Sequence, residues 1–430
     1  MSQFRLARIS LILAAIGLNA VPALAPAAFA QDKGSASAAA PETVRPELYK
    51  LLDSNKVKEL LAAKKYADVQ ANITAAEAID KLTPYEIYII DRTKLNLGVA
   101  SNDNDLTMKA LEAVINTGRA GKNDNAEFMQ VLGDRYFNAK NYAKAVEWYT
   151  RYQKEAPEPN KILNSLGKAY LLTNDYQNAR VQFDALVRNA EAAGKVPDFT
   201  ELDLLKVSYA RLKDTDGYIA TLEKIVTYHP TNENWTELLS RTQSKAGFNA
   251  RLQLDAYRLK LAAQKEMTPE EYVDMTELAL LGGFFTEAKN AMDAGFANGV
   301  LGKGSNAAKH KQLHDKATKS AADDEKNIAS GEASAKAGKT GQPMVNLGYA
   351  FASMGQYDKG IDLIEKGIAK GGLKNPDDAK LHLGVAYAKA GRKADAQKVF
   401  EGIKGNDGLG DLSRLWVLYL NRKPMAAAAS

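Results

Sequence analysis

The sequence lacks cysteine, contains only four histidines and has no long block of charges of one sign. Without cysteine the chain cannot form disulfides, so its stability depends on packing, which 430 residues can provide. The 57 lysines and arginines nearly balance the 52 aspartates and glutamates, and the two signs alternate along the chain. This pattern is typical of solvated helix faces and argues against a nucleic-acid partner or a membrane surface.

Residues 1–30 have the layout of a secretory signal peptide. Arg5 and Arg8 precede an apolar run that starts at Ile9, and residues 28–30 (Ala-Phe-Ala) form a small-x-small cleavage site. A membrane anchor is the alternative, but Asn19, Pro22 and Pro26 interrupt the run before it reaches the roughly 20 apolar residues that span a bilayer. We therefore expect cleavage before Gln31 and a periplasmic protein, with secretion as the second choice.

The chain after residue 30 contains no segment apolar enough to cross a membrane, so we expect no integral membrane segment after signal cleavage. The missing cysteine also excludes a lipid-anchored lipoprotein. Residues 31–45 are rich in alanine, serine and glycine, which predicts a flexible leader.

Residues 126–157 predict one helical hairpin. Apolar and small residues recur there at three- and four-residue steps on two successive segments, and Pro157 ends the second helix. The first segment carries Met129, Leu132, Gly133 and Tyr136, and the second carries Ala145, Trp148, Tyr149 and Tyr152. Two such helices cannot bury their apolar faces alone, so the hairpin needs stacked copies.

The copies occur at a spacing of 34 residues. The spaced pairs are Gly133 and Gly167, Tyr136 and Tyr170, Tyr142 and Tyr176, and Ala145 and Ala179, while Phe183 takes the place of Tyr149. This unit resembles the tetratricopeptide repeat family, in which a small residue sits at a close helix crossing flanked by aromatic residues. The resemblance implies an all-α fold, a right-handed superhelical solenoid of helical hairpins.

The repeat pattern varies along the chain and divides it into regions. We expect degenerate hairpins in residues 46–122, the repeat array in 123–300, a polar insert in 301–340, a repeat pair with a capping helix in 341–422, and a disordered tail in 423–430. The insert has almost no large apolar residue and cannot build a core, so we interpret it as an exposed helix or mobile segment that divides the array. The register between residues 232 and 268 is not fixed by the sequence.

Two patterns suggest cofactor or metal chemistry. Residues 333–340 satisfy the relaxed spacing of a phosphate-binding loop, but the preceding segment is polar and does not read as the buried strand that such a loop follows. His310 and His314 share one helix face beside Asp315, but two imidazoles without a placed third ligand bind a metal weakly. We interpret His229 and His382 as structural, and predict no cofactor, no metal and no catalytic residue.

An enzyme remains the alternative, because helical superhelical domains also occur in periplasmic enzymes that cleave peptidoglycan. Those enzymes resemble one another in a catalytic Glu-Ser step, and this chain contains no Glu-Ser dipeptide. The resemblance to tetratricopeptide repeats instead implies a non-catalytic protein–protein interaction scaffold or adaptor in the bacterial cell envelope. The sequence identifies neither the partner nor the oligomeric state.

The resemblance also implies a concave groove, lined by the first helix of each hairpin, that binds a partner peptide or helix. By repeat register the groove residues are Gln130, Asp134, Phe137, Asn138, Asn164, Lys168, Leu171, Leu172, Asp203, Val207 and Arg211. Their mix of apolar and charged side chains fits an amphipathic partner segment, although packing between adjacent repeats equally explains the leucines. Gln130 and Asp134 stand where a carboxylate clamp needs a cation and an amide, which argues against a receptor for chaperone tails.

Overall fold

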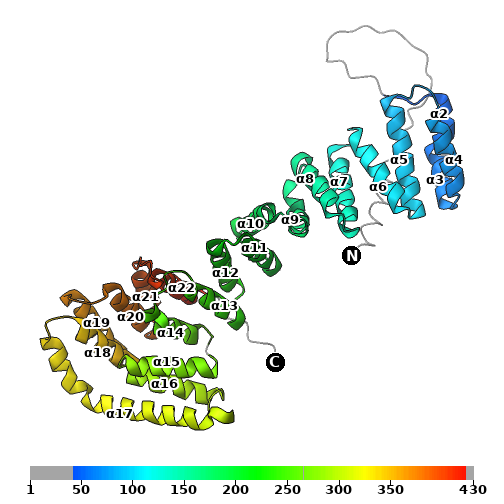
Figure 1. The fold of residues 1–430 in the computed structure, drawn as a ribbon. Coiled ribbons are helices and arrows are strands. Elements are labelled where there is room, and N and C mark those ends of the chain that lie inside the picture. Colours follow the sequence, from blue (N-terminus) through cyan, green and yellow to red (C-terminus); the bar gives the residue numbers. More distant parts are fainter. Residues whose placement is uncertain (1–41, 265, 423–430) are drawn as a thin grey trace, which may run out of the picture. The chain divides into compact units, whose positions relative to one another are not determined.

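The structure is a computed structural model that describes residues 42–264 and 266–422. Every regular element within these ranges is a helix, and consecutive helices pack as hairpins (Figure 1), so the predicted all-α helical-repeat fold is confirmed. No helix in the described ranges is both long enough and apolar enough to cross a bilayer. The predicted signal peptide and the predicted disordered tail lie outside the described residues.

The chain forms two compact units, an N-terminal unit that ends at Leu186 and a C-terminal unit that begins at Val187. The boundary falls inside helix α10 (Tyr176–Ala192), within the range 123–300 that the sequence analysis treats as one array. The expected division follows the repeat pattern, whereas the two units follow the distribution of tertiary contacts, so that division stays a prediction.

The N-terminal unit consists of hairpins that bury one face of each helix. Its elements are α2 (Pro46–Leu52), α3 (Ser54–Ala62), α4 (Tyr66–Glu77), α5 (Pro84–Ser101), α6 (Asn104–Asn116), α7 (Lys122–Asn138), α8 (Tyr142–Glu155), the 3₁₀ helix η1 (Pro159–Ile162), α9 (Leu163–Leu172) and the first part of α10. The N-terminus of α5 also holds Arg45, whose side chain binds Glu86 at 2.9 Å. Arg45 is therefore part of the folded unit and not of the expected leader.

The C-terminal unit contains the longest helix and closes with the last one. Its elements are the rest of α10, α11 (Phe199–Leu212), α12 (Thr215–Tyr228), α13 (Asn232–Gln243), η2 (Ala250–Leu252), α14 (Gln253–Gln264), α15 (Pro269–Leu281), α16 (Phe285–Ala297), η3 (Gly304–Asn306), α17 (Ala307–Ala337), α18 (Gln342–Ser353), α19 (Tyr357–Lys370), α20 (Pro376–Lys389), α21 (Lys393–Glu401) and α22 (Leu409–Asn421). Helix α22 packs against α21 and α20 and also against the distant α12 and α14.

Close helix crossings occur where the 34-residue pattern places them. An added Cβ at Gly133 would lie 2.4 Å from the Tyr149 ring, and one at Gly167 would lie 2.8 Å from the Phe183 ring. Each glycine therefore admits an aromatic ring of the paired helix. Between neighbouring hairpins, the Tyr136 hydroxyl donates a hydrogen bond to Glu112 at 2.5 Å.

The expected polar insert contains helix α17, which agrees with the exposed-helix alternative, but this helix also contributes to the core. Most of its polar residues face solvent, but Ala317 belongs to a core cluster with residues of α14 to α16, and Ile328 and Ala335 belong to another with residues of α18 and α19. Helix α17 therefore connects two core clusters of one unit and does not divide the array. Small residues supply this contact, which is why composition alone hides it. Residues 333–337 end this helix, so no strand precedes the phosphate-loop pattern.

Helices α18 and α19 approach each other through glycines. An added Cβ at Gly348 would lie 2.6 Å from the Gly360 carbonyl oxygen, and one at Gly360 would lie 2.5 Å from the Gly348 carbonyl oxygen. Gly341 and Gly367 repeat this contact two turns away. We call these four residues the glycine seam. Backbone lies against backbone there, so no ring can move aside to admit a side chain.

Candidate functional site

A groove of about 740 Å³ runs along α7 in the N-terminal unit. Its lining comes from α7, from the end of α8, and from the turn that leads through η1 to α9. The residues are Asn123, Ala126, Glu127, Gln130, Val131, Asp134, Tyr152, Pro157, Glu158 and Lys161. We call this surface the α7 groove.

The sequence of α7 places polar side chains in this groove. Asn123, Glu127, Gln130 and Asp134 recur at three- and four-residue steps and so share one face of the helix. Phe128, Met129, Leu132 and Gly133 lie on the opposite face, where they are buried in the core of the unit. Burial of this apolar face fixes the rotation of α7 and thereby points the polar row into the groove.

Partners within the protein fix some groove side chains and leave others unpaired. The Tyr149 hydroxyl donates a hydrogen bond to Asp134 at 2.6 Å, and Lys161 forms an ion pair with Glu158. Among the described residues, the side-chain amides of Asn123 and Gln130 have no hydrogen-bond partner. Each of these amides can both donate and accept a hydrogen bond.

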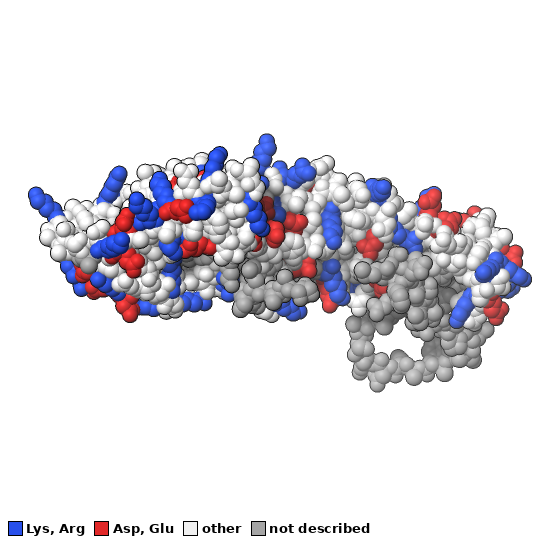
Figure 2. Space-filling model, turned by 90° about the horizontal axis from the view of Figure 1, so that it is seen from below, with Lys and Arg blue, Asp and Glu red and all other residues white. Residues whose placement is uncertain are grey.

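The groove is negatively charged. Its lining holds the carboxylates of Glu127, Asp134 and Glu158 and a single ammonium group, that of Lys161. A concave surface with an excess of one sign attracts the opposite sign. This is a local property, because acidic and basic side chains alternate over the face of the molecule shown in Figure 2.

Two of the predicted groove residues, Gln130 and Asp134, line the α7 groove. Phe137 does not, because its ring packs edge-on against Tyr142 within the hairpin at a centroid distance of 5.3 Å. The other predicted residues also lie outside the lining: Asn138 at the end of α7, Asn164, Lys168, Leu171 and Leu172 on α9, and Asp203, Val207 and Arg211 on α11. Leu172 is exposed, whereas Leu171 is half-buried.

Tyr152, Glu158 and Lys161 line the groove but were not predicted. They come from the end of α8 and the following turn, whereas the repeat register assigns groove positions only to the first helix of each hairpin. Pro157 and Pro159 are the sequence signal that could have indicated them, because these prolines stop α8 from continuing and begin η1.

The C-terminal unit contains a buried cluster of charges. Arg258 on α14 binds Glu287 on α16 at 2.6 Å and Asp255 at 2.6 Å, and Glu287 also accepts a hydrogen bond from the Tyr349 hydroxyl of α18 at 3.1 Å. His382 of α20 contacts Arg258 at 3.0 Å. Burial opposes ionisation, but Arg258 outweighs it and holds the pKa of both carboxyl groups below their usual values. We call these five residues the Arg258 cluster.

The histidines have partners within the fold. His310 accepts a hydrogen bond from the Gly302 amide at 3.3 Å, while His314 contacts Asp293 at 2.7 Å. His229 lies 2.8 Å from the Pro197 carbonyl oxygen, and His382 belongs to the Arg258 cluster. Within residues 42–264 and 266–422, no group of three histidine, cysteine or acidic side chains is placed to hold a metal ion.

Comparisons with known proteins identify the repeats. The family model described as tetratricopeptide repeat matches residues 131–194 and 345–409. No curated protein sequence matches the chain. These two matches cover α7 to α10 and α18 to α21, the hairpins in which glycine lies at the helix crossing.

Similar solved structures are also tetratricopeptide repeat proteins. One, from Parabacteroides merdae, is 13% identical over 77% of this chain and 98% of its own, with a TM-score of 0.27. The TPR2AB domain of yeast Sti1 in its pHSP90 complex is 15% identical over 68% and 98%, with a TM-score of 0.23. The P58(IPK) TPR domain is 13% identical over 86% and 98%, with a TM-score of 0.20. On the evidence of the two matched regions and their hairpin geometry, this chain contains tetratricopeptide repeats in residues 131–194 and 345–409.

Proposed function

We propose that the protein is a non-catalytic protein–protein interaction scaffold of the bacterial cell envelope, and that its α7 groove binds an extended, basic segment of a partner protein. The observation that carries this proposal is the pair of unpartnered amides, Asn123 and Gln130, in a groove with excess negative charge. Repeat proteins of this kind characteristically bind partners on concave surfaces.

The spacing of the two amides favours an extended segment. Asn123 and Gln130 are seven residues apart on one helix, which corresponds to about 10 Å along its axis. Three residues of an extended peptide span about the same length. Each amide can therefore bind one main-chain group of the partner, and these contacts are independent of the partner's sequence.

The charge of the groove favours basic side chains on the partner. Glu127, Asp134 and Glu158 surround the position that the segment would occupy, and only Lys161 would repel it. Because these charges are exposed or half-buried, binding should weaken as the salt concentration rises. The amphipathic segment expected from the sequence fits less well, since Phe137 is used inside the hairpin.

The same exposure argues against the alternative of a peptidoglycan-cleaving enzyme. Such an enzyme needs a carboxylic acid that remains protonated near neutral pH, and burial in an apolar pocket is the usual way to raise its pKa. The carboxylates of the α7 groove lie in a polar lining, and Glu158 is ion-paired with Lys161.

Photo-crosslinking tests the proposed groove. A photoreactive amino acid at Gln130 should form adducts with a partner in envelope extracts, whereas the same probe at Gln177, an exposed position on α10 outside the groove, should not. The variant with Asn123→Ala and Gln130→Ala should capture less partner than a control with Gln177→Ala and Asn189→Ala. Equal adducts at both probe positions, or equal capture by both variants, would contradict the groove.

The location in the cell envelope rests on the pattern of residues 1–30. Cell fractionation with N-terminal sequencing tests it separately. We expect the protein in the periplasmic fraction with Gln31 as its first residue. An uncleaved chain in the cytoplasmic fraction would refute the proposed location and leave the groove proposal standing.

A further inference from the structure

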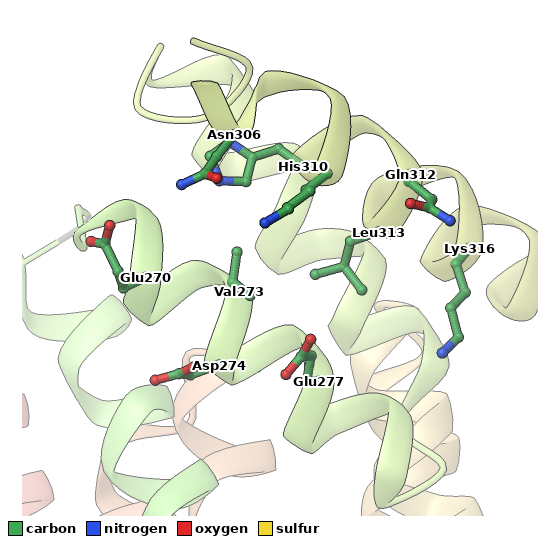
Figure 3. A pocket seen from close by; sticks show the side chains of 10 residues that line it. Glu270, Val273, Asp274, Glu277, Asn306, His310, Gln312, Leu313 and Lys316 are labelled. Atoms are coloured by element: carbon green, nitrogen blue, oxygen red, sulfur yellow. The ribbon is translucent and has the colours of Figure 1, made fainter. Parts of the chain in front are cut away.

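A second groove lies in the C-terminal unit, between helices α15 and α17. It has a volume of about 600 Å³. Figure 3 shows that α15 contributes Glu270, Val273, Asp274 and Glu277, and that α17 and the residue before it contribute Asn306, His310, Gln312, Leu313 and Lys316. Lys309 completes the lining. We call this surface the α15/α17 groove.

The two walls of this groove carry opposite charges. The wall from α15 bears three carboxylates, and the wall from α17 bears the ammonium groups of Lys309 and Lys316. Val273 and Leu313 are half-buried between the walls and form an apolar floor (Figure 3). Among the described residues, Glu270, Glu277, Lys309 and Lys316 have no side-chain partner, although each is next to a wall of opposite sign.

His310 gives the basic wall a built-in donor. Its side chain is buried, with a relative exposure of 6%, yet it lines the groove. The Nδ1 atom accepts the Gly302 amide proton at 3.3 Å, which places the ring proton of the neutral imidazole on Nε2. Nε2 has no partner among the described residues. Because His310 lines the groove, this N–H can donate a hydrogen bond to an acceptor on a ligand there.

We propose that the α15/α17 groove binds an extended peptide in which basic and acidic residues alternate. Successive side chains of an extended chain point to opposite sides. In a peptide that lies along the groove, two basic side chains can therefore face Glu270 and Asp274, while the acidic side chain between them faces Lys309 and His310. The aliphatic parts of these side chains cover Val273 and Leu313.

The spacing of the charges agrees with this arrangement. Glu270 and Asp274 are four residues apart on α15, which is about 6 Å along the helix axis. Alternate side chains on one side of an extended peptide are separated by about 6.6 Å. Nucleic acid and purely acidic peptides are disfavoured, because the α15 wall repels them, and purely basic peptides are repelled by the α17 wall. This site is in the other unit and does not depend on the α7 groove.

Fluorescence anisotropy of the full-length protein with a labelled, end-blocked peptide of alternating lysine and glutamate tests the proposal. The comparison peptide has the same composition arranged as one block of lysine and one block of glutamate. At low salt the alternating peptide should bind about tenfold more tightly than the block peptide. Equal binding of the two peptides would overturn the proposal, because it would show that the groove attracts charged peptides whatever the order of their charges.

Charge reversal sharpens the test. Glu270→Lys with Glu277→Lys, or Lys309→Glu with Lys316→Glu, should each weaken binding of the alternating peptide about tenfold. The variant with all four changes should restore it, because a shift by one residue exchanges the two faces of the peptide. If the variant with four changes is folded and does not restore binding, the proposed alternation is wrong.

A matched control uses the same helix. Lys319→Glu with Lys326→Glu makes the same change in charge at exposed positions of α17 outside the groove and should leave binding unchanged. If this control loses as much affinity for the alternating peptide as the Lys309 and Lys316 variant, the effect reflects only the net charge of the protein, and the proposed site is wrong. Asn123→Ala with Gln130→Ala should also leave it unchanged, which separates this test from that of the α7 groove.

Discussion

Both units are built from helical hairpins, but they differ in where the polar and charged side chains of their helices lie. In the N-terminal unit, the polar row of α7 lines an unfilled groove and keeps two amides without a partner. In the C-terminal unit, charged side chains of α14 and α16 are buried against one another in the Arg258 cluster, beside His382 of α20. The difference arises because α16, α18 and α20 all place side chains against Arg258 of α14 or its partner Glu287, which encloses these charges. Charged side chains that are enclosed in this way belong to the core and cannot contact a partner protein.

The Arg258 cluster provides the most severe test of this comparison. Arg258→Met leaves the carboxylates of Glu287 and Asp255 buried without their main cation, with only Lys389 still 3.7 Å from Glu287, so the free energy of unfolding should fall by about 3–5 kcal/mol. Chemical denaturation followed by circular dichroism measures the loss. A loss below about 1 kcal/mol would show that water reaches the cluster and that the C-terminal unit is not closed.

A compensated variant is the control for this prediction. Arg258→Met, Asp255→Leu and Glu287→Leu together remove the charges as well as their partner, and apolar replacement of a buried ionic group is often neutral. We expect this variant to recover most of the stability that Arg258→Met loses. Tyr349 would still lack the acceptor that Glu287 provides, so the recovery should be incomplete.

Two helix crossings, one in each unit, differ in what an added methyl group meets. Gly360→Ala meets the Gly348 carbonyl oxygen at 2.5 Å, and backbone cannot move without separating α18 from α19. We expect a loss of about 1–3 kcal/mol in the free energy of unfolding. Gly167→Ala meets the tip of the Phe183 ring at 2.8 Å, and its cost should be smaller, because the ring can tilt and alanine favours the helix. Thermal unfolding of both variants decides the order, and an equal loss would contradict the distinction.

One contact is common to both units and should respond equally to pH. Burial and a hydrogen-bonded carboxylate raise the pKa of Tyr136 and of Tyr387 to about 12. A tyrosine in the unfolded chain has a pKa of about 10, so these hydrogen bonds stabilise the fold fully below pH 10 and are lost as the pH rises through 12. Tyr136→Phe should cost about 1 kcal/mol near neutral pH and less as the pH rises. Denaturation at several pH values measures this, and a difference that does not depend on pH would exclude the linkage.

The sequence predicts what is periodic and misses what depends on distant contacts. The 34-residue spacing places Gly133 and Gly167 at helix crossings, because every copy of the hairpin meets the same neighbour. The Arg258 cluster has no such signal, since Arg258 and His382 are separated by 124 positions and meet only through closure.

The same limit explains the partial prediction of the α7 groove. The repeat register correctly places Gln130 in the groove. Lys161 also lines the groove, but it lies in the connection between α8 and α9, to which the register assigns no groove position. The core contacts of helix α17 were missed for a related reason. Its contacts use alanines such as Ala317, which do not stand out as core residues in a polar segment.

The smallest expected effect concerns how the C-terminal unit is closed. Arg414 of α22 binds Glu223 of α12 at 2.8 Å, but its side chain is 47% exposed, and such ion pairs contribute about 0.2–1 kcal/mol. Trp416 is 2% exposed and its ring stacks on Phe400 at a centroid distance of 5.7 Å. Arg414→Ala should therefore change the free energy of unfolding by less than about 1 kcal/mol, whereas Trp416→Ala should cost about 3–5 kcal/mol. If Arg414→Ala proves the more costly in chemical denaturation, closure depends on charges, and the C-terminal unit should then open at high salt.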